Sequence, residues 1–170
     1  MDLSEIDFRG ANLMRAAFRG ANLDGAQFIG AHLRHAGFHE CKKFTHCDFS
    51  GADLRYASFA RAYVSHACFR RAALHDAYFV DCRCHSTDFS GAVLESSTAL
   101  HSQFWSCNLE DVRFDGSDFT EALLFESEFP RSSWKRVKLA GATLRHSHLN
   151  GLDAHPGPVR FGSCQKSIHL

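Results

Sequence analysis

A large apolar residue recurs at every fifth position over most of this chain, and no other feature constrains its folding as strongly. From Leu3 to Phe38, Leu and Phe alternate at this spacing without exception; from Phe49 the period continues to Leu149, one residue out of phase. From Cys47 to Ser147, the residue two positions earlier is always Cys, Ala, Thr, Ser or Val. A five-residue period fits neither the helical turn of about 3.6 residues nor the alternation of a strand.

Two inward positions in every five residues, one large and one small, describe a coil built from short straight sides. Gly, Asn, Asp and Ser lie between these positions, and they tolerate tight turns. Each side can bury its apolar face only against the sides above and below it, so the repeat predicts a solenoid. Thirteen of the 16 Phe occupy the large inward position. The high Phe content is therefore expected to be a property of the core.

The phase of the repeat changes by one residue between Phe38 and Phe49. Phe44, Phe125 and Phe161 fall outside the count of central Phe, although one inserted residue near Lys42-Lys43 would return Phe44 to the central column. We interpret the insertion as a bulge or bend between two subdomains. The expected organisation is an N-terminal subdomain at 1–42, a C-terminal subdomain at 43–153, and a cap or tail at 154–170.

Gly-Ala-Asn-Leu at 10–13 and 20–23, and Ser-Gly-Ala-Asp-Leu at 50–54, resemble the pentapeptide-repeat family, whose pattern is written A(D/N)LXX. The resemblance covers roughly residues 2–153. It implies an all-β fold, a right-handed quadrilateral parallel β-helix in which four units form one coil. Two stacked core columns are then expected, one of Phe49, Phe69, Phe89, Leu109, Phe129 and Leu149 and the next of Leu54, Leu74, Leu94, Phe114 and Trp134.

The chain has 19 Lys and Arg against 19 Asp and Glu. This balance argues against a protein that wraps nucleic acid, because that function requires a basic excess. The charges are unevenly distributed, with nine acidic residues against Arg113 alone in 86–128 and seven basic residues against Asp153 in 129–170. The acidic stretch is either a solvated surface or a negative band that occupies a basic groove evolved for DNA. Its candidate partner-binding residues are Asp88, Glu95, Glu110, Asp111, Asp115, Asp118, Glu121, Glu126 and Glu128.

Two stretches resemble the Qnr-type quinolone-resistance members of the same family. They are residues 47–59, and the run from Phe129 to Val137 with the later His-Leu-Asn-Gly-Leu-Asp at 148–153. The resemblance implies a non-enzymatic DNA mimic that binds DNA gyrase or topoisomerase IV. Such a protein confers resistance or self-immunity to topoisomerase poisons such as fluoroquinolones. The alternative is a general protein-interaction scaffold without nucleic-acid mimicry.

The end of a solenoid must be covered, because its last coil exposes a cross-section of the core. Apolar residues near the C-terminus are candidates for this role, either as an intramolecular cap or as the seam of a homodimer. The Qnr-type resemblance implies dimerisation through the C-termini, and the sequence leaves both possibilities open. The candidate residues are Trp134, Leu149, Leu152, Val159 and Phe161.

Catalytic, cofactor-binding and metal-binding sites are not expected. His35, His66, His101 and His146 all lie two positions after a large inward residue, and a solenoid without long loops offers no pocket. Cys82 and Cys84 both fall on inward positions, and the other Cys lack the spacing of zinc ligands.

The cellular setting is predicted from the N-terminus and the seven Cys. Residues 1–5 show no basic and apolar signal sequence, and no apolar run approaches the length of a membrane span. An odd number of scattered Cys favours buried free thiols in a reducing compartment. We expect a cytoplasmic protein that contacts neither membrane nor nucleic acid directly.

Overall fold

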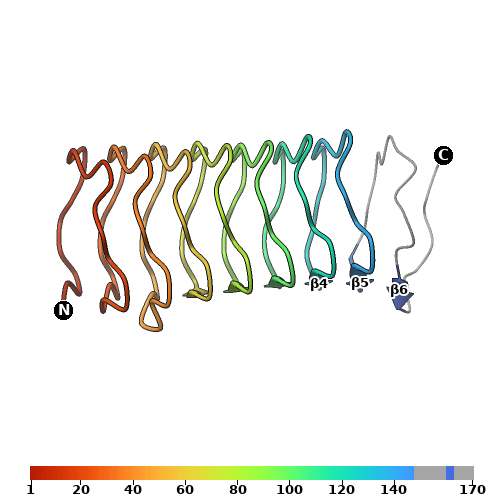
Figure 1. The fold of residues 1–170 in the computed structure, drawn as a ribbon, viewed down its shortest axis with the longest axis horizontal. Helices are drawn as coiled ribbons and strands as arrows, with labels where there is room; N and C mark the ends of the chain where they lie inside the picture. The colour runs from red at the N-terminus through yellow and green to blue at the C-terminus, as the bar shows by residue number, and fades with distance from the viewer. Residues whose placement is uncertain (148–159, 163–170) are drawn as a thin grey trace.

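The computed structural model shows a rod of stacked coils (Figure 1). It describes residues 1–147 and 160–162. Paired backbone positions such as Cys68, Asp88 and Asn108 lie 20 residues apart, so four five-residue units form one coil. The chain is thus an all-β parallel β-helix with four walls, and the predicted fold class is confirmed.

Each wall is defined by the column of large inward residues at its centre, here called central residues. The residue two positions after each central residue forms the corner that ends its wall. The first wall is centred on Phe8, Phe28, Phe49, Phe69, Phe89, Leu109 and Phe129; the second on Leu13, Leu33, Leu54, Leu74, Leu94, Phe114 and Trp134; the third on Phe18, Phe38, Phe59, Phe79, Ala99, Phe119 and Leu139; and the fourth on Leu3, Leu23, Phe44, Val64, Cys84, Phe104, Leu124 and Leu144.

The fourth wall holds the extended strands among the described residues. These strands form a six-stranded parallel sheet in chain order, along one side of the rod in Figure 1. Phe161 pairs with Leu144, so a rung of backbone pairing continues beyond the point where the repeat pattern ends in the sequence. The strands are β1 (Tyr63–Ser65), β2 (Arg83–His85), β3 (Gln103–Trp105), β4 (Leu123–Phe125), β5 (Thr143–Arg145) and β6 (Arg160–Gly162).

Backbone hydrogen bonds join each coil to the coils on both sides. The Phe49 N–H donates to the Cys68 carbonyl of the next coil at 2.7 Å, and the Asp53 N–H donates to the Ala31 carbonyl of the preceding coil at 2.9 Å. The Ala52 N–H closes the turn within the unit by donating to the Phe49 carbonyl at 3.0 Å. Because the same pattern recurs in unit after unit, the short segments satisfy their polar groups without long strands.

The Asp or Asn of the repeat pattern has a physical role in the turn. Asp48 Oδ1 accepts the Ser50 N–H at 2.8 Å, and this N–H has no inter-coil backbone partner. A short acceptor side chain two residues before the donor is the geometry of an Asx turn. The same contact is made by Asp2, Asp7, Asn12, Asn22, Asp53, Asp88, Asn108 and Asp118.

The corners require a left-handed backbone. Every corner residue from Glu5 to His146 has a positive φ, between 48° at Ser86 and 74° at Gly116. L-residues adopt this region at a steric cost that is largest for β-branched side chains. Accordingly, the corners contain Gly, charged residues, His, Ser and one Tyr, and none of them is Val, Ile or Thr.

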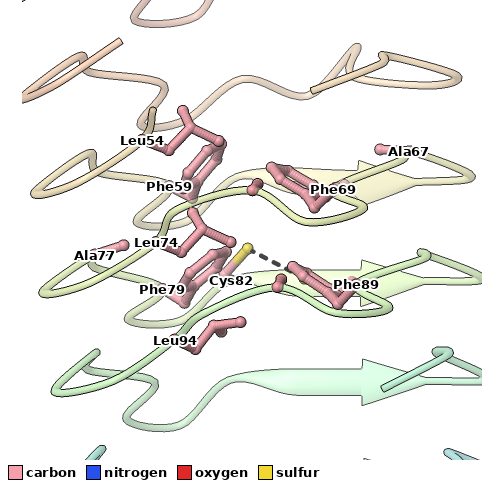
Figure 2. Packing of buried hydrophobic residues seen from close by; sticks show 14 of the residues in the cluster. Leu54, Phe59, Ala67, Phe69, Leu74, Ala77, Phe79, Cys82, Phe89 and Leu94 are labelled. Atoms are coloured by element: carbon pink, nitrogen blue, oxygen red, sulfur yellow. Dashed lines mark hydrogen bonds between the residues drawn. The ribbon is translucent and has the colours of Figure 1, made fainter. Parts of the chain in front are cut away.

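The core is a continuous stack of central side chains, with the small inward residues beside them (Figure 2). Rings in successive coils of the first wall lie nearly parallel, with centroids 4.9 Å apart for both Phe49–Phe69 and Phe69–Phe89. Every inward position from Cys47 to Leu144 is buried, as the period predicts. Leu149 lies outside the described residues.

Phe44 corrects the count of core Phe. Its side chain is 1% exposed and packs edge-on against Phe38, so it is a central residue of the fourth wall. The insertion that allows this is a bulge in which Cys41 turns inward while Lys42 and Lys43 remain exposed. The Cys41 thiol donates to the Phe18 carbonyl at 3.0 Å.

The ladders continue across the bulge with a spacing of 21 residues, as in Gln27 with Asp48. One hydrophobic cluster contains residues from both sides of the insertion. The division into subdomains at 1–42 and 43–153 stays a prediction.

A small central residue is compensated by its neighbour. Ala99 leaves space in the third wall between Phe79 and Phe119. Phe104 of the fourth wall fills this space, with its ring centroid 6.4 Å from Phe79 and 5.6 Å from Phe119. The break in the repeat at Ala99 is thus absorbed by packing in the core.

Truncation of a stacked ring should destabilise the rod far more than truncation of an outward residue. We expect Phe69→Ala to lower the free energy of unfolding by about 3–5 kcal/mol, because it removes a fully buried ring and leaves a cavity. Arg70→Ala should cost about 1 kcal/mol or less, since its ion pair with Asp88 is exposed. Urea denaturation followed by circular dichroism measures both, and similar losses would contradict the inward register.

Candidate partner-binding surface

The acidic residues of 86–128 are distributed over all four walls. Four lie on the first wall or at the corner that ends it: Asp88, Glu110, Asp111 and Glu128. Glu126 lies at the corner that ends the fourth wall and leads into the first. Glu95 and Asp115 lie on the second wall, and Asp118 and Glu121 on the third. The structure therefore brings together about half of the predicted band.

Most of these carboxylates are ion-paired with a neighbouring coil. Arg131 pairs with both Glu110 and Asp111, and its hydrogen bonds lower the pKa of Asp111. Similar pairs join Asp88 to Arg70, Glu95 to Arg113 and Asp118 to Lys138. Glu121 lies 3.1 Å from His101 Nδ1, a pair that carries opposite charges only when the imidazole is protonated. The negative charge of the band is thus partly compensated within the rod.

Glu126 and Glu128 are exposed and form no ion pair with a described residue. Glu126 accepts a hydrogen bond from the Ser106 hydroxyl at 3.3 Å. Asp115 is also without an ion pair, but it accepts hydrogen bonds from the Ser133 hydroxyl and the Lys135 N–H. Together with Glu110 and Asp111, the two exposed glutamates form an acidic cluster on the first wall and the corner that leads into it.

The candidate cap residues fall into three groups. Trp134 is 1% exposed and contacts the rings of Phe114 and Phe129, so it lies within the core. Phe161 belongs to β6. Leu149, Leu152 and Val159 lie outside the described residues, and a C-terminal homodimer stays a prediction.

The fourth wall carries a surface that the sequence did not predict. All twelve ion pairs between described residues lie on the first three walls and their corners. Arg83 on the fourth wall instead lies over the Tyr63 ring, 5.4 Å from its centroid. The 20-residue spacing of Tyr63 and Arg83 would have placed them side by side, once the number of walls was known.

Recesses in the outer surface are open and lined by long side chains. One lies between Arg70 and Arg71 near Ser50, and another between Lys42 and Arg83 near Tyr63. Within the described residues, no three His, Cys, Asp or Glu side chains are placed to hold a metal ion. The same residues contain no helix that is long and apolar enough to cross a membrane.

The six described Cys are free thiols: Cys41, Cys47, Cys68, Cys82, Cys84 and Cys107. Burial raises the pKa of Cys47 and Cys107 to about 12 and also raises that of Cys84. Since the thiolate is the nucleophile, these side chains are inert in the folded protein.

We expect iodoacetamide at pH 8 to leave Cys47, Cys84 and Cys107 unmodified in the native protein, because their raised pKa values keep the thiols protonated. In urea the same residues should react fully. Peptide mass spectrometry measures the modification at each site. Rapid native labelling of Cys107 would contradict its burial.

Comparison with known proteins agrees with this geometry. The sequence profile described as pentapeptide repeats matches in eight copies, over residues 11–42, 43–71 and 57–95. The chain belongs to the pentapeptide-repeat family. A search of curated protein sequences finds no match.

Several solved structures share the fold. A trypsin-treated form of QnrB1, a plasmid-mediated fluoroquinolone resistance protein, aligns with a TM-score of 0.51 and 22% identity over 92% of this chain and 78% of that one. HetL is a pentapeptide repeat protein involved in heterocyst differentiation regulation in the cyanobacterium Nostoc sp. strain PCC 7120. It aligns with a TM-score of 0.47 and 18% identity, over 84% of this chain and 72% of that one. A pentapeptide repeat protein of the Arabidopsis thaliana thylakoid lumen aligns with a TM-score of 0.43 and 30% identity, over 71% of this chain and 66% of that one. At these similarities the QnrB1 alignment supports the fold alone.

Proposed function

We propose that this chain is a non-enzymatic rod that binds a protein partner through one of its walls. The observation that carries the proposal is the filled interior: central and small inward residues occupy the tube from Phe18 to Leu144. Only the outward side chains can therefore contact a partner. Flat walls with regularly spaced outward residues suit an extended protein interface, as in other solenoids.

Affinity capture with wall variants tests this proposal. Purified protein is immobilised and exposed to lysate of its source cells, and retained proteins are quantified by mass spectrometry. We expect one partner to be lost when exposed charges on a single wall are reversed and retained when those on the other walls are reversed. Retention of the same proteins by every variant, or of none by the wild type, would overturn the proposal.

A second candidate function is binding to DNA gyrase or topoisomerase IV, which could confer resistance or self-immunity to topoisomerase poisons such as fluoroquinolones. The observation that favours it is the acidic cluster on the C-terminal half of the first wall and the corner that leads into it, made of Glu110, Asp111, Glu126 and Glu128. Such a cluster can occupy a basic groove that otherwise holds DNA phosphates. The fold shared with QnrB1 is consistent with this candidate.

A supercoiling and drug-stabilised cleavage assay with purified gyrase or topoisomerase IV tests the second candidate. If the acidic cluster binds the enzyme, a quadruple variant should weaken the effect on supercoiling and cleavage by about tenfold or more. This variant combines Glu110→Gln, Asp111→Asn, Glu126→Gln and Glu128→Gln. The matched control should change the effect on supercoiling and cleavage by about twofold or less. It replaces Glu95, Asp115, Asp118 and Glu121 by the corresponding amides. Both variants remove four negative charges, so an equal loss would assign the effect to net charge.

The assay also has an outcome that rejects the candidate itself. If the wild-type protein at about 10 µM changes neither supercoiling nor drug-stabilised cleavage, topoisomerase binding fails for that enzyme. The rod would then retain the broader protein-binding function.

A further inference from the structure

The fourth wall differs from the other three in its charges. Between Lys43 and His146, its outward residues include Lys43, Arg83 and Arg145, and Glu126 is the only acidic residue among them. None of the three cations forms an ion pair with a described carboxylate, whereas most arginines on the other walls do. Lys43 lies close enough to Asp2 of the same wall to help lower the pKa of that carboxyl. The uncompensated positive charge of this wall is therefore that of Arg83 and Arg145.

The acidic residues at the corner between the third and fourth walls do not neutralise this positive charge. Glu40 at that corner pairs with Arg19 and Arg61, and Asp81 pairs with Arg61. Glu121 at the same corner pairs with His101. Apart from Glu126, the acidic groups at the corners that border these coils are engaged with Arg19 and Arg61 or, for Glu121, with His101.

Outward rings are concentrated on the same wall. Trp105 on β3 lies 5.4 Å from Phe125 on β4, and Phe125 lies 5.5 Å from His146, measured between ring centroids. Nearer the N-terminus, the rings of His46 and His66 stack 5.3 Å apart. Tyr63 is 48% exposed and Trp105 is 40% exposed. Exposed apolar surface of this kind, beside uncompensated charge, marks interaction sites.

A recess lies at the N-terminal end of this surface. It is lined by Lys42, Arg61, Tyr63, Asp81 and Arg83, beneath the bulge that the insertion creates. Lys42 and Arg83 are cations without an ion pair to a described carboxylate, whereas Arg61 is paired with Glu40 and Asp81. The ring of Tyr63 supplies an apolar side. The recess can therefore receive an acidic or aromatic side chain that anchors a bound segment.

We propose that the fourth wall binds an acidic protein segment carrying aromatic or large aliphatic side chains. The proposal rests on the protein-binding function inferred above and assigns that function to one wall and one class of partner. From Lys43 to Thr143 the wall spans five coil steps of about 4.8 Å, or roughly 24 Å. An extended segment of about seven residues covers that length at about 3.3 Å per residue.

A protein segment suits this wall better than a nucleic acid strand. The outward rings contact one another along the rod, and the Phe125–His146 pair is nearly perpendicular, at 83°. Rings engaged in this way do not form a row of open faces on which bases could stack. Three cations over roughly 24 Å are also sparse for a phosphate backbone, which binds through many basic contacts.

Selection from a phage-displayed library of random 12-residue peptides tests the proposal. The immobilised full-length chain is the target, and enriched sequences are synthesised with a fluorescent label for polarisation measurements. We expect enriched peptides to combine Asp or Glu with Trp, Phe or Leu. Arg83→Glu with Arg145→Glu should weaken their binding by about tenfold or more.

A matched control reverses Lys135 and Arg136 to Glu. Both are exposed residues of the second wall without an ion pair to a described carboxylate, and the change in net charge is the same. The control should alter affinity by about twofold or less. Trp105→Ala should weaken binding by about fivefold, and Trp105→Phe should restore part of the loss. Circular dichroism confirms that each variant is folded.

Three results would overturn the proposal: no enrichment of acidic and apolar sequences, equal losses in the two double variants, or tighter binding of a 12-nucleotide single strand than of the selected peptides. Affinity capture that maps a protein partner to another wall would refute the fourth wall while leaving the protein-binding function intact. Failure of capture on every wall would refute both.

Discussion

The hydrogen bond between neighbouring coils is the interaction on which this structure depends. A five-residue unit is too short to satisfy its own backbone, and most of its N–H groups find their acceptors in the coils on either side. This requirement fixes the stacking direction and the spacing between coils. It also places each central side chain over the central side chain one coil away, as in Phe49 with Phe69 and Phe59 with Phe79, which makes the core a set of columns. Stability and shape therefore have one origin.

The same ladder explains how the rod tolerates irregularity. At the bulge, one additional residue is accommodated because Cys41 turns inward and donates its thiol hydrogen to the Phe18 carbonyl, while the columns on either side stay paired. At Ala99, a missing side chain is replaced by Phe104 from the adjacent wall. Three small polar residues at inward positions donate their hydroxyls to turn carbonyls: Ser102 to Ala99, Ser117 to Phe114, and Ser132 to Phe129.

The contacts of outward residues depend on the coil spacing, because backbone pairing places residues 20 positions apart side by side. Arg131 meets Asp111 and Lys138 meets Asp118 in this way, so a chain of zero net charge forms ion pairs across its coils. Where the column instead brings together Tyr63 with Arg83, or Trp105 with Phe125, the surface becomes cationic and aromatic. The walls thus acquire distinct chemistry from a nearly uniform repeat.

The five-residue period alone determined the solenoid, the inward register and the position of the insertion, because inward packing requires a large and a small residue in every unit. It also identified Phe69 and Phe89 as core residues. Only the tertiary structure decided which outward charges meet. Residues 86–128 form one acidic stretch along the chain, yet the coils divide them among four walls and pair many of them with arginines and Lys138 from neighbouring coils. Among the described residues, the lack of ion pairs on the fourth wall is likewise a property of neighbours 20 residues apart, and linear charge patterning does not reveal it.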